Sequence, residues 1–559
     1  MNAAVLAIIG ISAILAGYRF YSKFIAEKIY QLDPNFKTPA HTMRDDIDFV
    51  PTNRLVLWGH HFTTVAGAAP IIGPGIAVIW GWLPAFLWVV LGTIFFAGVH
   101  DFGSVWASIR HQARSIGTLT GDVVSVRARA LFMVVIFFLL LMVNAVFAVA
   151  ISDAFQATPS SVIPAWSAIV VAVIIGLLIY RLHVPLTVPT IVGTVVLYAV
   201  IYLGELVPIE LPATVAGLAP GAQWIIILFA YAALASILPV WLLLQPRDYI
   251  NGIQLFVGLG LLYGAVLIAS PPIVAPAINQ NLPAGAPPLV PLLFVTVACG
   301  AISGFHGLVG SGTTSKQLNC EPDARFVGYL GSSGEGMLAI VAIIAATAGF
   351  ASLSEWEAMY TSFGAGGMTA FVQGGAVIAS AGLGLPIPFA QTLLTVMAVL
   401  FAATTMDSGV RLQRYIIQEM GTIYSIAPLQ NGYTATGIAV GACLALAFGA
   451  GGSTGSGGML IWPLFGTTNQ LLAGLTLLVI SVILVKLGRP ARYTLTPMIF
   501  VTGMAFLSAV HQLWDLYTSG QYFLVLVDIV IVITAVLVML ESMSAFMRER
   551  QNAAAAPVG

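Results

Sequence analysis

Charged residues are scarce in this chain of 559 residues. Asp, Glu, Lys and Arg together make up only 8% of it, whereas 59% of the residues are hydrophobic. A soluble domain usually carries about 25% charged residues, so the chain lacks the side chains that the surface of a soluble protein needs. It also has no run of Lys and Arg that would bind nucleic-acid phosphates. The composition predicts a polytopic, all-α membrane protein whose surroundings are the lipid bilayer.

Motifs of metal sites, nucleotide sites and membrane enzymes are missing as well. The chain has three cysteines, and they lie far apart without a CxxC pair, so they indicate neither a disulfide framework nor a metal site. No HExxH, GxGD or GxSxG motif is present. Gly307 and Gly312 have the spacing of a phosphate-binding loop, but Thr313 stands where that loop needs Lys. We therefore expect no metal, no cofactor, no nucleotide and no enzymatic activity.

Long apolar segments recur along the whole chain. A helix needs about 20 apolar residues to cross the hydrocarbon core of a membrane. The sequence predicts about 15 such helices, within a range of 14 to 18. They are expected near 2–18, 62–81, 82–108, 129–150, 163–180, 186–204, 222–244, 250–270, 290–312, 326–350, 387–406, 433–450, 458–486, 495–516 and 522–545.

The basic residues follow every second predicted helix. All 21 Lys and Arg lie after odd-numbered helices, and the alternate connections contain none. Because cytoplasmic loops collect Lys and Arg, the N-terminus is expected outside and the C-terminus in the cytoplasm. Residues 366–383 are apolar too, but counting them as a crossing would move the following basic residues outside. We therefore expect an external or re-entrant helix there, packed on protein rather than lipid.

The second predicted helix contains a concentration of glycine and proline. Each proline removes an N–H and clashes with the preceding turn, so the helix is expected to be broken near mid-membrane. Secondary transporters bind substrate and ions at such breaks; a kink that only aids packing is the alternative. The substrate-binding candidates here are Gly67, Ala68, Ala69, Pro70 and Gly73.

The seventh predicted helix carries Pro239 near its middle, between Ser236 and Trp241. It lies five helices after the second one and would run in the opposite direction. Two broken antiparallel helices at that spacing are typical of an inverted repeat of five plus five helices. We therefore expect a second part of the substrate site at these three residues.

The ninth predicted helix is rich in small and polar residues. Small residues every fourth position, beginning at Ser303, favour close helix contact, and packing alone is the alternative reading. Ser303 and His306 are expected to face the pathway. Hydroxyl oxygens suit a hard cation such as Na⁺, so Thr313, Thr314 and the neighbouring Lys316 are ion-coupling candidates.

Four further titratable residues lie within or near predicted helices. Charge inside a membrane is costly unless it is paired or serves function. Asp101 and Glu335 could carry a proton, and His60 and His61 stand at the cytoplasmic mouth of the second helix. For Asp101, the alternative is an ion pair with an arginine such as Arg110 or Arg247.

Two charged pairs stand at predicted cytoplasmic helix ends. Asp407 and Arg411 are four residues apart and share a helix face, and Arg247 is followed directly by Asp248. Both pairs are interpreted as helix-end anchors or an inner gate.

These observations divide the chain into four parts. Residues 1–60 are expected to form the first membrane helix and a cytoplasmic amphipathic arm. Residues 61–425 would be the transporter core, with inverted repeats at about 61–204 and 222–406. Peripheral membrane helices would occupy 426–550, and 551–559 would be a disordered tail.

Several long motifs resemble signatures of the carbon starvation protein A family. The matching segments are 59–62, 67–74, 238–249, 303–306, 312–316, 406–415 and 462–470. The resemblance implies a carrier of the bacterial inner membrane with a leucine-transporter-like fold, of the amino acid-polyamine-organocation superfamily type. It implies uptake of peptides in some members and of pyruvate with protons in others. Gln245 and Ser315 differ from the residues common in the family, Cys and Pro, and leave the substrate open.

The resulting hypothesis is a secondary transporter, monomeric or dimeric. It would import short peptides or a small carboxylate such as pyruvate, coupled to H⁺ or Na⁺, by alternating access around the second and seventh helices. An ion or solute channel is the alternative, and a membrane-embedded enzyme is a weaker one. Fifteen spans in one chain favour a carrier, and counterflow of labelled substrate would separate a carrier from a channel.

Overall fold

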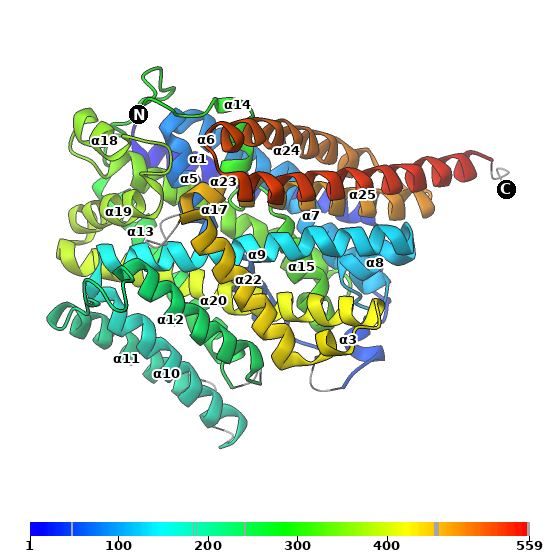
Figure 1. The fold of residues 1–559 in the computed structure, drawn as a ribbon, viewed down its shortest axis with the longest axis horizontal. Helices are drawn as coiled ribbons and strands as arrows, with labels where there is room; N and C mark the ends of the chain where they lie inside the picture. The colour runs from blue at the N-terminus through cyan, green and yellow to red at the C-terminus, as the bar shows by residue number, and fades with distance from the viewer. Residues whose placement is uncertain (46–47, 183, 186, 240–241, 452–457, 556–559) are drawn as a thin grey trace.

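The computed structural model describes residues 1–45, 48–182, 184–185, 187–239, 242–451 and 458–555. Most of these residues are helical, as the composition predicts (Figure 1). The helices are α1 Ala3–Ala16, α2 Ser22–Phe24, α3 Pro39–Thr42, α4 Arg54–Val65, α5 Ala69–Ala77, α6 Trp82–Gly92, α7 Gly98–Arg110, α8 Ile116–Val123, α9 Val126–Ala157, α10 Val162–Tyr180, α11 Thr187–Leu206, α12 Pro220–Ile237, α13 Leu244–Ala269, α14 Leu289–Thr296, α15 Gly304–Val309, α16 Ser315–Gln317, α17 Leu330–Ala348, α18 Leu353–Met359, α19 Gly367–Leu383, α20 Ile387–Ile423, α21 Ala427–Gln430, α22 Gly432–Gly451, α23 Gly458–Lys486, α24 Arg492–Thr518 and α25 Tyr522–Ala555.

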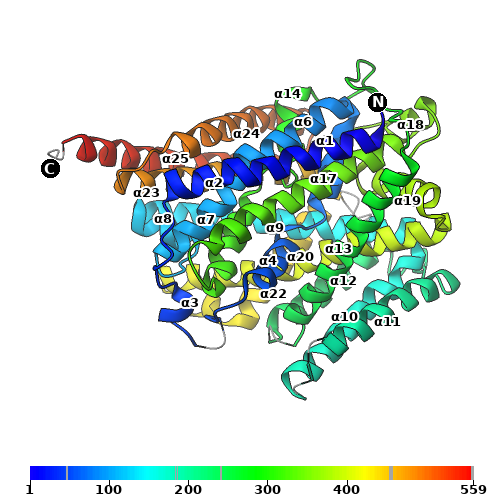
Figure 2. The same cartoon turned by 180° about the vertical axis from the view of Figure 1, so that it is seen from behind.

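Thirteen helices in the described part of the chain are long and apolar enough to cross a membrane. The bent pair α4 and α5 makes a fourteenth. The remaining predicted span, 290–312, is divided into the short helices α14, α15 and α16. The prediction of about 15 spans is thus confirmed within its stated range. The first predicted helix is longer than expected and runs from Ala3 to Tyr30, with α1 beside α17 on the back of the bundle (Figure 2).

Residues 367–383 form α19, a helix of 17 residues that is too short to count among the candidate spans. Its glycines allow close packing: Gly374 touches Gly349 at the end of α17, and Gly382 touches Ala265 on α13. A side chain at either position would collide with backbone. The segment therefore packs against protein, as expected for a helix that does not cross the membrane.

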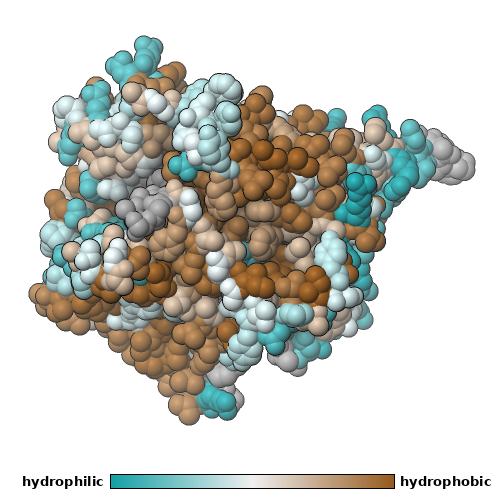
Figure 3. Space-filling model, viewed as in Figure 1, coloured by the Kyte–Doolittle hydropathy of each residue, from teal (hydrophilic) through white to brown (hydrophobic). Residues whose placement is uncertain are grey.

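The outer surface of the bundle is largely apolar. Figure 3 shows hydrophobic residues over the middle of the molecule and hydrophilic ones gathered toward its two ends. Exposed large apolar side chains on α10, α24 and α25 contribute to this surface, among them Val170, Ile174, Val510, Leu526 and Ile533. Such a belt is stable against lipid but not against water. The beginning of α1 and the end of α25 lie at opposite ends of the molecule (Figure 1).

Two boundaries in the predicted division of the chain need correction. α23 was placed among peripheral helices, yet 94% of its most apolar window is buried, the largest share among the candidate spans of the described residues. Its polar stretch from Thr467 to Gln470 is buried as well, and it belongs to the core. At the other boundary, α25 continues to Ala555, so 551–555 are helical instead of disordered. The alanine run there has high helix propensity, and 556–559 lie outside the described residues.

Candidate transport site

The second predicted span is broken between α4 and α5, which are bent by 51°. α4 ends at Val65, and the N–H of Gly67 donates to the carbonyl of Val65 instead of continuing the helix. Pro70 is the second residue of α5, a place where a missing N–H costs little. The amide of Gly67 is thus diverted from the Thr63 carbonyl, its helical partner. The structure thus has a break in this span, formed by Ala66, Gly67 and Ala68, and Ala69 is the first residue of α5.

A second break lies in the ninth predicted span, not in the seventh. α14 ends at Thr296, and α15 begins only at Gly304. Asn469 of α23 holds the beginning of α15. Its Oδ1 accepts the N–H of Phe305 at 3.0 Å, and its Nδ2 lies 3.1 Å from the Ser303 Oγ and 3.5 Å from the Cys299 Sγ. Sequence reasoning did not single out Asn469, although it stands in one of the family-like motifs.

The seventh span, by contrast, is not interrupted at Pro239. α12 ends at Ile237, and Pro239 is exposed beyond that end. Arg411 donates to the carbonyls of Ala235 and Leu238, both at 2.6 Å, and so caps the helix end. The expected mid-membrane break there is wrong, because the helix is terminated by a cap from α20.

Residues near this helix end lie away from the two breaks. The Ser236 carbonyl accepts a bond from Arg414 at 2.6 Å, and its hydroxyl lies 3.4 Å from Thr436 on α22. Trp241 lies outside the described residues. The breaks occur in the second and ninth spans. The five-plus-five repeat was inferred from breaks in the second and seventh spans, and the second of these breaks is missing from the described residues.

The two broken helices pack against each other. Gly73 of α5 faces the end of α14: a Cβ at this position would lie 2.5 Å from the Thr296 carbonyl oxygen. A Cβ built on Gly300, in the second break, would lie 3.2 Å from the side chain of Pro74 in α5. On the other side, the His61 Nδ1 of α4 lies 2.8 Å from the Thr314 hydroxyl. The structure therefore joins the second span to the ninth.

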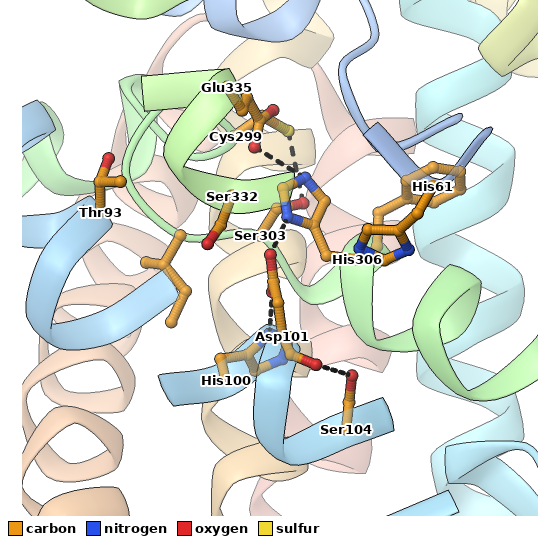
Figure 4. Close-up of polar contacts among 12 residues, drawn as sticks. His61, Thr93, His100, Asp101, Ser104, Cys299, Ser303, His306, Ser332 and Glu335 are labelled. Atoms are coloured by element: carbon orange, nitrogen blue, oxygen red, sulfur yellow. Dashed lines mark hydrogen bonds and ion pairs between the residues drawn. The ribbon is translucent and has the colours of Figure 1, made fainter. Parts of the chain in front are cut away.

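Four buried titratable residues form a continuous chain beside this junction (Figure 4). The Asp101 carboxylate of α7 lies between two imidazoles, 2.7 Å from the His100 Nδ1 and 2.8 Å from the His306 Nδ1. The Nε2 of His306 is in turn 3.0 Å from the Glu335 Oε2 of α17, within ion-pair distance. We call His100, Asp101, His306 and Glu335 the histidine–carboxylate cluster. Neither arginine considered for Asp101 is its partner: Arg110 pairs with Glu321 at 2.6 Å, and Arg247 with Asp407.

The histidine–carboxylate cluster is closed off from solvent. All four side chains are at most 1% exposed, and the Glu335 Oε1 and His100 Nε2 are buried without a hydrogen-bond partner among the described residues. A buried polar atom without a hydrogen-bond partner lowers the stability of the fold. The Glu335 Oε1 and the His100 Nε2 are also atoms on which a proton can reside. Within the same described part of the chain, no group of three or more His, Cys, Asp or Glu could hold a metal ion.

Widened helical turns flank this cluster. Residues 93–97, 310–314 and 325–329 form turns of the π type, directly before α7, after α15 and before α17. Such turns are frequently found at functional sites. They lie on the three helices that supply Asp101, His306 and Glu335, so the backbone around the cluster departs from regular helix on each of its sides.

Thr313 and Lys316 are not part of the cluster, although Thr314 binds His61. Thr313 is exposed, and its hydroxyl donates to the Val309 carbonyl of its own helix. Lys316 lies 3.7 Å from Asp48 in the arm before α4. Lys316 thus contacts the arm, and the Thr313 hydroxyl binds only its own helix among the contacts of the described residues.

A second charged cluster lies between α12, α13 and α20. Arg247 is only 2% exposed and is paired with Asp407. The Tyr231 hydroxyl accepts a bond from Arg247 at 2.5 Å and donates to Asp407 at 2.8 Å. Asp248 follows Arg247 and lies 3.9 Å from His60. We call Tyr231, Arg247, Asp248 and Asp407 the arginine cluster.

The arginine cluster corrects two expectations. Arg247 lies in the first turn of α13, as expected for a helix end, but it is buried; Arg411 lies inside α20, and Asp407 pairs with Arg247 rather than with Arg411 four residues on. Arg247 and Tyr231 also line a small, partly open pocket of about 270 Å³ together with Phe155 and Trp166. The pocket is otherwise apolar.

Comparison with known proteins identifies the family. The family model described as carbon starvation protein CstA matches residues 2–359 and 351–508. This chain belongs to that family. Among its relatives, the peptide transporter CstA of Campylobacter jejuni is 32% identical over 556 residues, which cover 90% of this chain and 79% of that protein. The peptide transporter CstA of Escherichia coli is 31% identical, covering 88% of this chain and 78% of the relative.

A CstA-family relative with a different named substrate is nearly as similar. The pyruvate/proton symporter BtsT of Escherichia coli is 29% identical and covers 88% of this chain and 78% of that protein. Among solved structures, a mutant of the Eremococcus coleocola manganese transporter matches at 12% identity with a TM-score of 0.47, covering 89% of this chain and 95% of that one. The CstA-family relatives are named as transporters, and none of those described is named as an enzyme.

Proposed function

We propose that this CstA-family protein is a secondary transporter of the bacterial inner membrane that imports short peptides or a small carboxylate such as pyruvate together with protons. Both substrate classes occur in the names of its relatives, and one relative is named as a proton symporter. With the basic residues in the cytoplasm, the N-terminus lies outside and the C-terminus inside.

The observation that carries the proposal is the position of the histidine–carboxylate cluster at the junction of two broken helices. A proton-coupled carrier must bind a proton in one orientation and release it in the other. Two carboxylates that share one imidazole can do so, because two like charges at one site disfavour the fully ionised form. His306 sits in α15, directly after the second break, so a movement of this helix changes the distances to Asp101 and Glu335 together.

The substrate site in this proposal lies between the breaks. α5 begins directly after Gly67 and Ala68, and a helix N-terminus favours a carboxylate. Ser303 and Asn469 supply polar groups from the other break. Ala69, Pro70 and Gly73 shape the backbone on the side of α5. Ser236, Pro239 and Trp241 are not assigned to this site.

Coupling to Na⁺ is the second candidate, and it is favoured by one observation. The break in α4 and α5 diverts a backbone amide, and the Thr405 hydroxyl beside Gly67 is buried without a partner among the described residues. Carbonyl and hydroxyl oxygens are suitable ligands for a hard cation. Varying the two gradients separately distinguishes Na⁺ from H⁺.

The test is uptake into proteoliposomes containing the purified full chain. Pyruvate and dialanine would be offered with a pH gradient and a Na⁺ gradient imposed one at a time. We expect accumulation of one of them under the pH gradient and acceleration of labelled substrate by unlabelled substrate on the opposite side. Flux without such acceleration would indicate a channel, and no movement of either substrate under either gradient would contradict the proposal.

Substitution of single carboxylates tests the role of the cluster. Asp101→Asn and Glu335→Gln should abolish accumulation above the equilibrium level while exchange of substrate across the membrane continues, because each mimics a permanently protonated acid. Glu357→Gln, at an exposed position in the 351–365 connection, is the matched control and should accumulate substrate normally. Normal gradient-driven accumulation in both cluster variants would remove the cluster as the coupling site.

A further inference from the structure

Asp248 is a buried carboxylate with little to stabilise its charge. Its side chain is 6% exposed, and its Oδ1 has no hydrogen-bond partner among the described residues. The cation nearest in sequence, Arg247, turns its guanidinium to Asp407 and Tyr231. An unpaired ionised carboxylate in such a place is strongly unfavourable. Asp248 must therefore bind a proton or face a protonated partner.

His60 is the group that can supply that partner. The groups that face Asp248 are Arg247 of its own helix, Asp407 of α20, Tyr231 of α12 and His60 of α4. Of these, Arg247 and Asp407 are paired with each other. The His60 Nδ1 lies 3.9 Å from the Asp248 Oδ2, at ion-pair distance, and its side chain is 27% exposed. His60 is thus the more accessible member of this pair.

His61 follows His60 in the sequence but lies on the side of α4 that faces the histidine–carboxylate cluster. Consecutive residues on an α-helix point about 100° apart, so His60 faces α13 while His61 faces α15 to α17. His61 is fully buried, contacts Thr314, and would collide with any side chain at Gly331, one turn before Glu335. It lies within electrostatic range of Asp101, His306 and His60. Figure 4 shows its ring beside that of His306.

We infer that Asp248 and His60 form a second proton-holding site, connected through His61 to the histidine–carboxylate cluster. The proton resides either on Asp248 as the carboxylic acid or on His60 as the imidazolium facing the carboxylate. It leaves to His61 when that imidazole is neutral. The inference rests on the proposed function, since it assigns a second proton to the same transport cycle. One proton would be held at each cluster per substrate moved.

The number of protons moved per substrate is the quantity that tests this inference. In proteoliposomes with a fixed substrate gradient, the pH gradient is varied until net flux stops, and the balance gives the coupling ratio. Pyruvate is the probe, or dialanine if pyruvate is not moved. Asp248→Asn should lower the ratio by one proton, which reduces the limiting accumulation about tenfold for each unit of pH gradient. Asp515→Asn is the matched control, because Asp515 forms a His–Asp pair with His511 at an exposed position of α24.

Failure of the inference can be told apart from failure of the proposed function. If the native chain responds to the pH gradient and Asp248→Asn keeps its coupling ratio, the second site is wrong while proton coupling stands. If the native chain does not respond to pH at all, proton coupling is wrong, and infrared spectroscopy decides the second site. Either the C=O stretching band of a protonated carboxylic acid should then be lost in Asp248→Asn, or the ring band of an imidazolium should be lost in His60→Gln, and the absence of both losses would overturn the inference. The second variant also covers the case in which Asp248→Asn does not fold.

Discussion

The histidine–carboxylate cluster and the arginine cluster are both buried, yet they hold charge in different ways. The first consists of two imidazoles and two carboxylates, side chains that can bind and release a proton: His100, Asp101, His306 and Glu335. The second is built around Arg247, which stays charged in any protein environment. Its partner Asp407 is held by both Arg247 and Tyr231.

The histidine–carboxylate cluster is therefore suited to moving a proton, whereas the Arg247–Asp407 pair holds a fixed charge. A guanidinium cannot deliver a proton, so the Arg247–Asp407 pair fixes the packing of α13 against α20. The imidazoles can deliver one, and π-type turns interrupt the helices that carry them. The comparison predicts that removal of one charge from the Arg247–Asp407 pair lowers stability, whereas removal of a carboxylate from the histidine–carboxylate cluster abolishes coupling.

The largest loss of stability is expected for Asp407→Asn. Removal of one partner from a buried ion pair leaves the other charge uncompensated, which costs about 3–5 kcal/mol. Thermal unfolding of the purified chain in detergent, followed by tryptophan fluorescence, should show a marked decrease in midpoint. The double variant Arg247→Met/Asp407→Leu removes both charges and should recover much of the loss. An unchanged midpoint for Asp407→Asn would show that Arg247 does not depend on this partner.

A smaller loss of stability is expected for Gly73→Ala. This substitution changes the packing where the two breaks meet and leaves the charges of both clusters unchanged. Its new methyl group would meet the Thr296 carbonyl oxygen at 2.5 Å. Forced overpacking of this kind costs about 1–3 kcal/mol. Transport should slow while the coupling ratio stays constant.

The control for Gly73→Ala is Gly264→Ala on α13. Nothing lies within 4 Å of a Cβ at this position. Alanine there should stabilise the helix by up to about 1 kcal/mol. Equal transport rates in the two glycine variants would contradict the close packing of α5 on α14.

The smallest change in stability is expected for Glu335→Gln. Glutamine has the shape of the neutral acid, so the free energy of unfolding should change by less than about 1 kcal/mol even though accumulation is lost. The same thermal-unfolding experiment compares the midpoint of Glu335→Gln with that of Asp407→Asn. A loss as large as that of Asp407→Asn would place Glu335 among the fixed structural charges and remove the contrast between the clusters.

Much of the architecture could be predicted because it depends on local sequence. Runs of about 20 apolar residues reveal spans directly, and Pro70 with its glycine neighbours reveals the first break. Asp101 and Glu335 were singled out by the rule that charge inside a membrane serves a purpose, and His306 as a residue expected to face the pathway. Their mutual contact did not follow, because they lie on three different helices.

The predictions were wrong where the local structure depends on a residue that is distant in the sequence. Pro239 was expected inside a helix, but Arg411, more than 170 positions later, caps α12 before the proline is reached. Arg247 was assigned to a loop because it is basic, whereas Asp407 allows it to be buried. The second break also lacks a proline at its centre: it depends on Asn469, whose role is visible only once α23 is placed beside α15.

The bond from Asn469 to α15 has a consequence for biogenesis. During synthesis, the segment with Ser303 and Phe305 enters the membrane long before α23 is translated, because 164 residues separate Phe305 from Asn469. Until then, the N–H of Phe305 lacks the acceptor that it has in the folded protein, and exposed backbone amides are poorly tolerated in lipid. The insertion machinery or neighbouring helices must therefore shelter this half-helix while the later spans are made. A chain truncated before α23 should therefore be recognised by membrane quality control as unfolded at the second break.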